Sequence, residues 1–541
     1  MDSTVNRRTL LAMATALTAS GVVAQAVAAQ DAASTPAATP AGGIAPGDTI
    51  PPEIANATAT DWPVEGRDLA QSRSVTESPI DASTVSTLAE AWSFDLDINA
   101  PYGALVANPI ISGDILYLQD ANSNIHALNR ETGELLWETI YDESVPSGGP
   151  NGVAVGYGAI IYPVGNGTII AADKTTGEEI WRTDVSGPMG EGVCMAPLIY
   201  DNRVWVSTTP ASTVSSDLAG RRGVIHLLDI TDGHLIWYFD TTTDNLWGNP
   251  SVNAGGGLWH PPAVSDDGGV YYAIGNIYPY PGNEEYPSGS SRPGDNDYAN
   301  NVLQIDTETG GLIWHTNITG RDIFDLDTHL VIWGQVDLGD GFIQDLVFAS
   351  GKHGFVVALD PATGLQFWRT PVGTHRNQFL QEVPEGEEIE VWPGTLGGVE
   401  TPFAYHNGVV YTAVFEQPSI YSPTLLESGL DIASSVGKVS ALDARNGSII
   451  WEVDIPSGVL AAATGVNDLV FTGALDGVVR ALSTVDGSVV WSAQASAGLN
   501  APLAVSGEYL YVPAGGPLVP SAETSDPAPE SQARLIAYKL A

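Results

Sequence analysis

Residues 358–368 read Ala-Leu-Asp-Pro-Ala-Thr-Gly-Leu-Gln-Phe-Trp, and six variants of this stretch occur elsewhere in the 541-residue chain. In every copy a tryptophan stands four residues after a glycine. The polar side chain before the turn can cap backbone N–H groups, and the glycine suits a positive φ. The pattern predicts a strand, a tight turn and a second strand that carries the ring. The glycines are 133, 177, 233, 310, 364, 447 and 487, and the tryptophans are 137, 181, 237, 314, 368, 451 and 491.

The two ends of the chain supply an eighth copy in two halves. Residues 89–94 contain Trp92 with no preceding strand, and residues 535–539 form a strand with no following tryptophan. A second strand type, alternating and rich in aromatic and β-branched residues, recurs between the copies, as in residues 409–412. We therefore expect an all-β, eight-bladed β-propeller with tryptophan-docking motifs over residues 61–541. The N-terminal strand, residues 86–96, should join the C-terminal blade and close the ring.

The N-terminus is typical of an export signal. Asn6-Arg7-Arg8-Thr9-Leu10-Leu11 begins an apolar run, and Ala26-Val27-Ala28 supplies a small-x-small cleavage site. We expect a twin-arginine signal peptide over residues 1–29, with an ordinary Sec signal as the alternative. Residues 30–60, rich in Ala, Pro and Thr, suggest a disordered tether. The mature chain should be exported, to the periplasm or the cell exterior, and should have no membrane span.

Composition excludes several classes of partner. The formal net charge is −44, from 64 acidic and 20 basic residues, so nucleic acid should be repelled. The single cysteine, Cys194, allows no internal disulfide, and no c-type haem motif is present.

Four further segments, in order along the chain, strengthen a family resemblance. They are the opening segment Trp62–Arg73, the run Gly255–Trp259 followed by Gly275-Asn276, the turn Phe324–Asp327, and Lys352–Phe355. Together with the repeat, they resemble the pyrroloquinoline quinone (PQQ) propellers, and the alcohol-dehydrogenase branch in particular.

The resemblance implies a cofactor site. Trp259 would lie against the flat quinone, and Lys352 would contact it. Calcium would be held by Asn276, Asp325 and Asp217, and Asp325 would be the catalytic base. The substrate would be a small alcohol-type molecule, and the electrons would pass to a separate acceptor protein.

The same comparison leaves a second hypothesis open. The family's adjacent cysteine pair is missing from residues 146–151, and Asp217 fits a ligand position only with a one-residue shift. Gly397–Glu400 replaces a segment that usually carries Asn and Trp. The alternative is a non-catalytic propeller that acts as an extracytoplasmic binding or scaffold module. The enzyme hypothesis requires Trp259, Asn276, Asp325 and Lys352 to converge on one pocket.

Overall fold

The chain is described by a computed structural model over residues 43–98, 100, 102–141, 149–210, 218–429, 431–519 and 531–541. Helical turns are short and few in these ranges, and they comprise α2 Pro52–Ala55, α3 Asp244–Trp247, η1 Val85–Thr87, η2 Pro287–Gly289 and η3 Ile432–Ser434. The expected signal peptide, residues 1–29, lies outside the described residues. No helix in the described part of the chain is long and apolar enough to cross a membrane.

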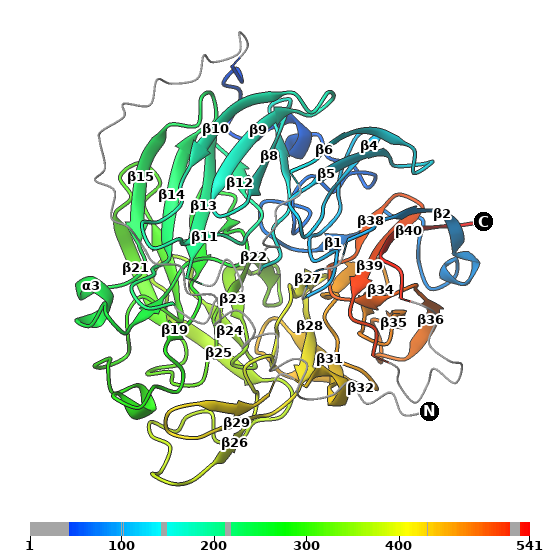
Figure 1. The fold of residues 1–541 in the computed structure, drawn as a ribbon. Coiled ribbons are helices and arrows are strands. Elements are labelled where there is room, and N and C mark those ends of the chain that lie inside the picture. The colour runs from blue at the N-terminus through cyan, green and yellow to red at the C-terminus, as the bar shows by residue number, and fades with distance from the viewer. Residues whose placement is uncertain are drawn as a thin grey trace. The chain divides into compact units, whose positions relative to one another are not determined.

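Strands dominate the structure and form a propeller-like, all-β fold, in which successive sheets follow one another around a common centre (Figure 1). In the described ranges, eight sheets have four or five strands that run mostly in chain order. The first four comprise β3 Ile110–Ser112, β4 Ile115–Gln119, β5 Ile125–Asn129 and β6 Leu135–Thr139; β7 Ala154–Gly156, β8 Ala159–Val164, β9 Thr168–Asp173 and β10 Glu179–Asp184; β11 Gly192–Val193, β12 Leu198–Tyr200, β13 Arg203–Thr209, β14 Val224–Asp229 and β15 Leu235–Asp240; and β17 Ala263–Val264, β18 Val270–Ala273, β20 Asn301–Ile305 and β21 Leu312–Asn317.

The other four sheets continue the series. They comprise β22 Leu330–Asp337, β23 Ile343–Ser350, β24 Phe355–Leu359 and β25 Gln366–Pro371; β27 Ala404–His406, β28 Val409–Glu416, β31 Val436–Asp443 and β32 Ile449–Ile455; β33 Thr464–Val466, β34 Leu469–Gly473, β35 Val478–Ser483 and β36 Val489–Gln494, with β1 Ser74–Val75 added in parallel; and β37 Gly498–Leu499, β38 Ala504–Ser506, β39 Tyr509–Gly516, β40 Arg534–Lys539 and β2 Ala89–Asp95. Two small sheets pair β16 Ala254–Gly255 with β19 Ile277–Tyr278, and β26 Ile389–Val391 with β29 Ser419–Tyr421 and β30 Leu426–Ser428.

The pairing expected between the two chain ends is present. Strand β2 runs antiparallel to β40, and Trp92 lies opposite Ala537. The last sheet therefore contains strands from both ends of the sequence.

The repeated tryptophans and glycines meet between neighbouring sheets. A β-carbon at Gly177 would lie 2.6 Å from Cε3 of Trp137, and one at Gly364 would overlap with Trp314. Seven glycines contact the tryptophan of the preceding copy in this way: Gly133, Gly177, Gly233, Gly310, Gly364, Gly447 and Gly487. Several indole N–H groups also donate across the junction, such as Trp314 to the Pro361 carbonyl at 2.9 Å. Each indole therefore fastens one sheet to the next.

Residues 59–78, which we term the girdle segment, contact the first strands of successive sheets. The Ala59 carbonyl accepts from the N–H of Gly507 at 2.7 Å, and the Ser78 hydroxyl donates to the Gly507 carbonyl at 2.8 Å. The segment thus returns to the residue where it began. In between, residues 62, 63, 69, 70, 72 and 73 pair with residues 111, 155, 264, 333, 405 and 465, in that order.

The folded part begins earlier than residue 61. Within the expected tether, the N–H of Gly47 donates to Asn202 Oδ1 at 2.7 Å, and Glu53 forms an ion pair with Lys174 at 2.7 Å. Ile44 is buried. These contacts show that part of the expected tether, from Ile44 onward, packs on the folded domain. Composition does not reveal this, because a few anchoring side chains suffice among Pro, Ala and Thr.

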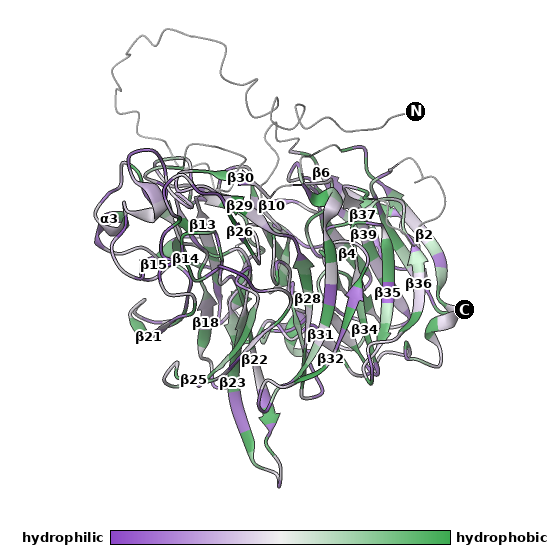
Figure 2. Ribbon diagram, turned by 90° about the horizontal axis from the view of Figure 1, so that it is seen from below, coloured by the Kyte–Doolittle hydropathy of each residue, from purple (hydrophilic) through white to green (hydrophobic). Residues whose placement is uncertain are grey.

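One hairpin departs from the regular pattern. Strands β22 and β23 each have eight residues, and their hairpin projects beyond the neighbouring sheets (Figure 2). Its tip exposes Phe342 and Ile343.

We predict that Gly364→Ala destabilises the protein more than Gly386→Ala. Both glycines have φ near +70°, at +71° and +75°, but only Gly364 contacts an indole, whereas the space beside Gly386 is open. Gly386→Ala should cost about 1–2 kcal/mol from backbone strain alone. Gly364→Ala should cost roughly 1–3 kcal/mol more through overpacking. Urea denaturation measures both, and equal losses would show that the docking contact contributes nothing.

We predict that a chain beginning at residue 43 melts like the full chain, whereas one beginning at residue 61 melts several degrees lower. The second truncation removes the Glu53–Lys174 ion pair and the Ala59–Gly507 hydrogen bond. Calorimetry compares the two, and identical melting would restore the tether assignment for residues 43–60.

Candidate functional site

Asp325 lies in the connection between β21 and β22 and is held by its neighbour Asp322. The two carboxylate oxygens of Asp322 accept from the backbone N–H groups of Phe324 and Leu326, both at 2.8 Å. This turn fixes Asp325 in the left-handed region, at φ +67°, where non-glycine residues are uncommon. Asp325 is 4% exposed. Its carboxylate is therefore fixed by local structure.

Asp325, Asp327 and Lys352 form a buried charge cluster. The Lys352 ammonium lies 2.8 Å from Asp327 Oδ2 and 3.3 Å from Asp325 Oδ2. The Asn276 amide donates to the Asp325 carboxylate, and the backbone N–H of Asn276 donates to that of Asp327. The Thr395 hydroxyl also donates to Asp325. Residues far apart in sequence therefore meet at one carboxylate.

The cluster contains more potential negative charge than positive charge. Burial raises the pKa of Asp325 well above its usual value, although Lys352 works in the opposite direction. Burial also raises the pKa of Glu400 to about 7. For Lys352, burial opposes the charged form, but Asp325, Asp327 and Glu400 outweigh it and raise its pKa well above 10.5. One ammonium is paired with two buried carboxylates and is influenced by the carboxyl group of Glu400, so an added cation would stabilise the ionised forms of these acids.

Trp259 lies beside this cluster. A β-carbon at Gly275 would be 2.9 Å from the indole Nε1 and 3.1 Å from Asp327 Oδ1. The N–H of Gly275 donates to the Gly257 carbonyl at 2.8 Å, which brings the Trp259 and Asn276 segments side by side. The indole is half-buried. Trp259, Asn276, Asp325 and Lys352 therefore gather at one place.

Two other predicted features cannot be placed. Asp217 lies outside the described residues, because residues 211–217 are not described. The same holds for residues 146–148, which belong to the undescribed stretch 142–148. The adjoining Gly149 packs on Cys194, since a β-carbon there would lie 3.0 Å from the sulfur. Cys194 is buried and accepts from the Thr209 hydroxyl at 3.3 Å.

Three site residues were not predicted from sequence. Asp327 lies two residues after Asp325 in the segment Phe324–Asp327, and this short spacing could have indicated a second carboxylate at the site. Thr395 comes from the long connection before β27, where no local pattern marks it. Glu400 lies in the segment Gly397–Glu400, which departs from the sequence that the resemblance implies.

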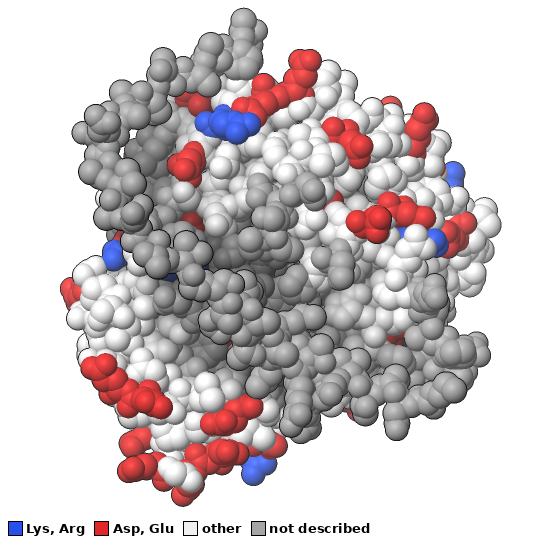
Figure 3. All heavy atoms as spheres, viewed as in Figure 1, with Lys and Arg blue, Asp and Glu red and all other residues white. Residues whose placement is uncertain are grey.

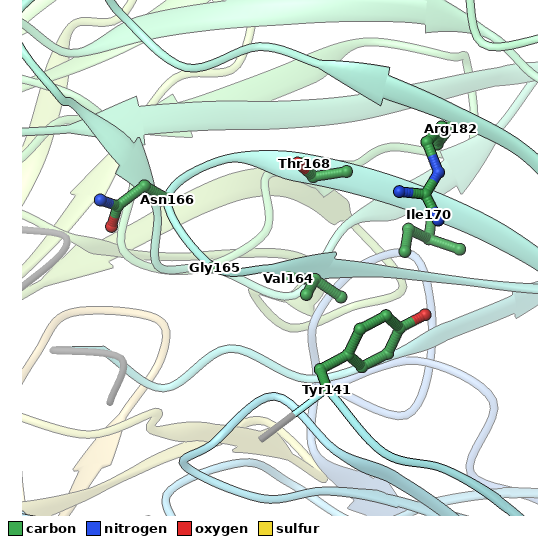
Figure 4. Close-up of a pocket in the computed structure, with 7 residues that line it drawn as sticks. All are labelled: Tyr141, Val164, Gly165, Asn166, Thr168, Ile170 and Arg182. Atoms are coloured by element: carbon green, nitrogen blue, oxygen red, sulfur yellow. The ribbon is translucent and has the colours of Figure 1, made fainter. Parts of the chain in front are cut away.

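A separate pocket lies away from this cluster. It has a volume of about 380 Å³ and is lined by Tyr141, Val164, Gly165, Asn166, Thr168, Ile170 and Arg182 (Figure 4). None of the clustered residues borders it. The face in Figure 3 carries scattered Asp and Glu side chains with few Lys and Arg, in keeping with the net charge of −44.

Two family models match the sequence. A family model described as outer membrane protein assembly factor BamB matches residues 121–258 and 352–522, over half of the chain. A second, described as glucose/ethanol/alcohol dehydrogenase, β-propeller domain, matches residues 62–157. The fold is that of a PQQ-like repeat propeller. The chain belongs to the PQQ-dependent alcohol dehydrogenase and PQQ-like repeat family.

Curated relatives align over much of the sequence. Quinohemoprotein alcohol dehydrogenase ADH IIB of Pseudomonas putida is 25% identical over 490 residues, covering 77% of this chain and 67% of the relative. Quinohemoprotein alcohol dehydrogenase of Comamonas testosteroni is 28% identical over 342 residues, covering 57% of this chain but only 46% of the relative.

Solved structures share the fold. The quinohemoprotein alcohol dehydrogenase from Comamonas testosteroni has a TM-score of 0.74 at 20% identity, covering 90% of this chain and 81% of that one. A europium-containing methanol dehydrogenase has a TM-score of 0.74 at 19% identity, covering 90% and 100%.

We predict that Lys352→Met destabilises the cation-free protein by about 3–5 kcal/mol, because it leaves buried carboxylates without their partner. Added calcium should recover part of this loss. The matched control is Lys438→Met, which removes a more exposed pair with Glu452 and Asp454 and should cost about 0–1 kcal/mol. Denaturation with and without calcium measures both, and equal losses for the two variants would contradict the strongly buried cluster.

Proposed function

We propose that this protein is an exported quinoprotein oxidoreductase that oxidises an alcohol or related substrate with PQQ and calcium. The observation that carries the proposal is the convergence of Trp259, Asn276, Asp325 and Lys352. Family membership and the names of the relatives, which are quinohemoprotein alcohol dehydrogenases, support the same activity.

The residues suit the cofactor by their chemistry. Trp259 offers an aromatic face for a flat ring system. Asn276 and Asp325 offer oxygen ligands of the kind that calcium takes, and the nearby Asp327 adds a second carboxylate. The quinone, when bound beside the cation, supplies the hydride acceptor.

Asp325 has the role of general base, accepting the hydroxyl proton of the alcohol. Burial raises the pKa of Asp325, and a neighbouring cation would lower it and so favour the carboxylate that accepts the proton. Lys352 contributes positive charge beside this carboxylate. Thr395 donates to the same group and holds its orientation.

The donor set favours a hard cation. Two carboxylates and one amide oxygen suit hard cations generally. One structural neighbour is a europium-containing methanol dehydrogenase, so a trivalent lanthanide is the natural competitor to calcium.

We also infer that the eight sheets are the blades of a closed ring. The β2–β40 pairing supports closure, and so does the contact of Trp491 with Tyr538 of the last sheet at 5.6 Å between ring centroids. The return of the girdle segment to Gly507 supports it independently.

Export and electron transfer complete the proposal. The Arg7-Arg8 motif and the following apolar run support twin-arginine export of the folded chain to the periplasm or cell exterior. Because the sequence holds no c-type haem motif, electrons would leave to a separate acceptor protein.

A scaffold function is the second candidate. Two observations favour it: the matching family model described as an assembly factor, and the absence of the cysteine pair. In that case the chain would bind no PQQ.

We predict that the purified chain binds PQQ with calcium or a lanthanide and reduces a dye with short alcohols. Asp325→Asn should lower kcat by about a hundredfold or more, because the basic oxygen is lost. Excess metal should not restore it, whereas Asn276→Ala should respond partly to excess metal because only a neutral ligand is lost.

The decisive measurements are an absorption titration with PQQ and a dye-linked assay of each variant. Absence of PQQ binding at micromolar concentration with every metal would favour the scaffold function. Binding and turnover with an unaffected Asp325→Asn variant would retain the enzyme and reject the base.

A further inference from the structure

Glu65, on the girdle segment, contacts His260, the residue after Trp259. Its Oε1 lies 2.6 Å from Nδ1 of His260, and the Glu65 side chain is 6% exposed. Its backbone carbonyl accepts from the Trp62 indole and from Arg73, both at 3.0 Å. The girdle therefore fixes Glu65 on its backbone side, while the carboxylate reaches His260.

His260 links this contact to the two halves of the candidate site. It directly follows Trp259, and its ring stacks on His329 with centroids 5.6 Å apart and an interplanar angle of 29°. His329 follows the Asp325–Asp327 turn by two residues, and its Nε2 donates to the Glu400 carbonyl at 3.1 Å. Two contacts, Glu65 with His260 and His260 with His329, thus lead from the girdle to residues that adjoin the indole and the carboxylates in the chain.

The His329 ring is buried and is held from two directions. Its orientation is set by the Glu400 carbonyl on one side and by His260 on the other. Removing the support of His260 would free the ring that borders the Asp325–Asp327 turn.

We propose that Glu65 is a positioning residue for the cofactor site, which acts by holding His260 and through it Trp259 and the Asp325–Asp327 turn. The proposal rests on the proposed function for the identity of the ligand. It gives the girdle a second role, because the segment that contacts successive sheets also orders the residues for the quinone and the metal.

The chain offers a closely matched control. Glu53 is also an N-terminal carboxylate, with a side chain 8% exposed, and it forms an ion pair with Lys174 at 2.7 Å. It contacts Tyr157 and Gly158 and none of the site residues. Glu53→Ala should therefore reproduce the loss of a buried N-terminal carboxylate without disturbing the site.

The experiment uses the full chain as wild type, Glu65→Ala, Glu65→Gln and Glu53→Ala. Each variant is titrated with PQQ in calcium, with tryptophan fluorescence and visible absorption as readouts. Hydrogen exchange of the cofactor-free proteins is followed in peptides covering residues 254–260 and 322–330. Both measurements are made far below each variant's melting temperature, so that only folded protein is compared.

We expect Glu65→Ala to weaken PQQ binding by about tenfold, the loss typical of removing a residue that orients a ligand-binding group. Exchange should rise in both peptides. Glu65→Gln retains an acceptor for His260 and should stay close to wild type, and Glu53→Ala should change neither readout. Equal exchange in Glu65→Ala and Glu53→Ala would overturn the proposal. If wild type binds no PQQ, the proposed function fails, and the exchange comparison still decides whether Glu65 positions these segments.

Discussion

The guanidinium group of Arg73 is completely buried, and its five N–H groups all donate hydrogen bonds. The acceptors come from three sheets and from the girdle itself: Ala463, Thr464, Leu503, Asn108 and Glu65. Burial lowers the pKa of Arg73 to about 10, so the group remains charged and must keep these partners. An uncompensated buried charge would be expensive, so the surrounding carbonyls have little freedom to separate.

This constraint explains why a short segment can organise many sheets. Each sheet alone exposes a first strand with unpaired backbone groups. The girdle satisfies one or two of these groups in most sheets and passes to the next, while the indoles fasten the outer parts of neighbouring sheets. The hydrogen bonds from the girdle act at the first strand of a sheet, and the tryptophan packing acts at its last strand, so the two kinds of contact hold opposite edges of the sheet.

The sequence was most informative where the physics is local. A glycine, a turn and an indole lie within about eleven residues of each copy, so the docking motif and the β2–β40 pairing could be predicted. The path of the girdle could not, because the contacts that lead it from sheet to sheet are mostly backbone hydrogen bonds to residues up to several hundred positions away, and such bonds leave no side-chain pattern. The packing of residues 43–58 could not be predicted either, because it depends on a few isolated side chains that form no repeated pattern.

The candidate site likewise contains residues that the sequence predicts and residues that it does not. Trp259, Asn276, Asp325 and Lys352 could be found because each stands in a short recognisable segment. Thr395 and Glu400 belong to a long connection, and only the folded chain brings them to Asp325 and Lys352.

Their presence matters for the family departures. Gly397–Glu400 differs from the usual sequence, yet the N–H of Val399 donates to the Gly351 carbonyl at 3.0 Å and brings a carboxylate toward Lys352. Glu400 therefore adds negative charge near Lys352. Such a cluster depends more strongly on a cation, since each added negative charge raises the cost of leaving it uncompensated.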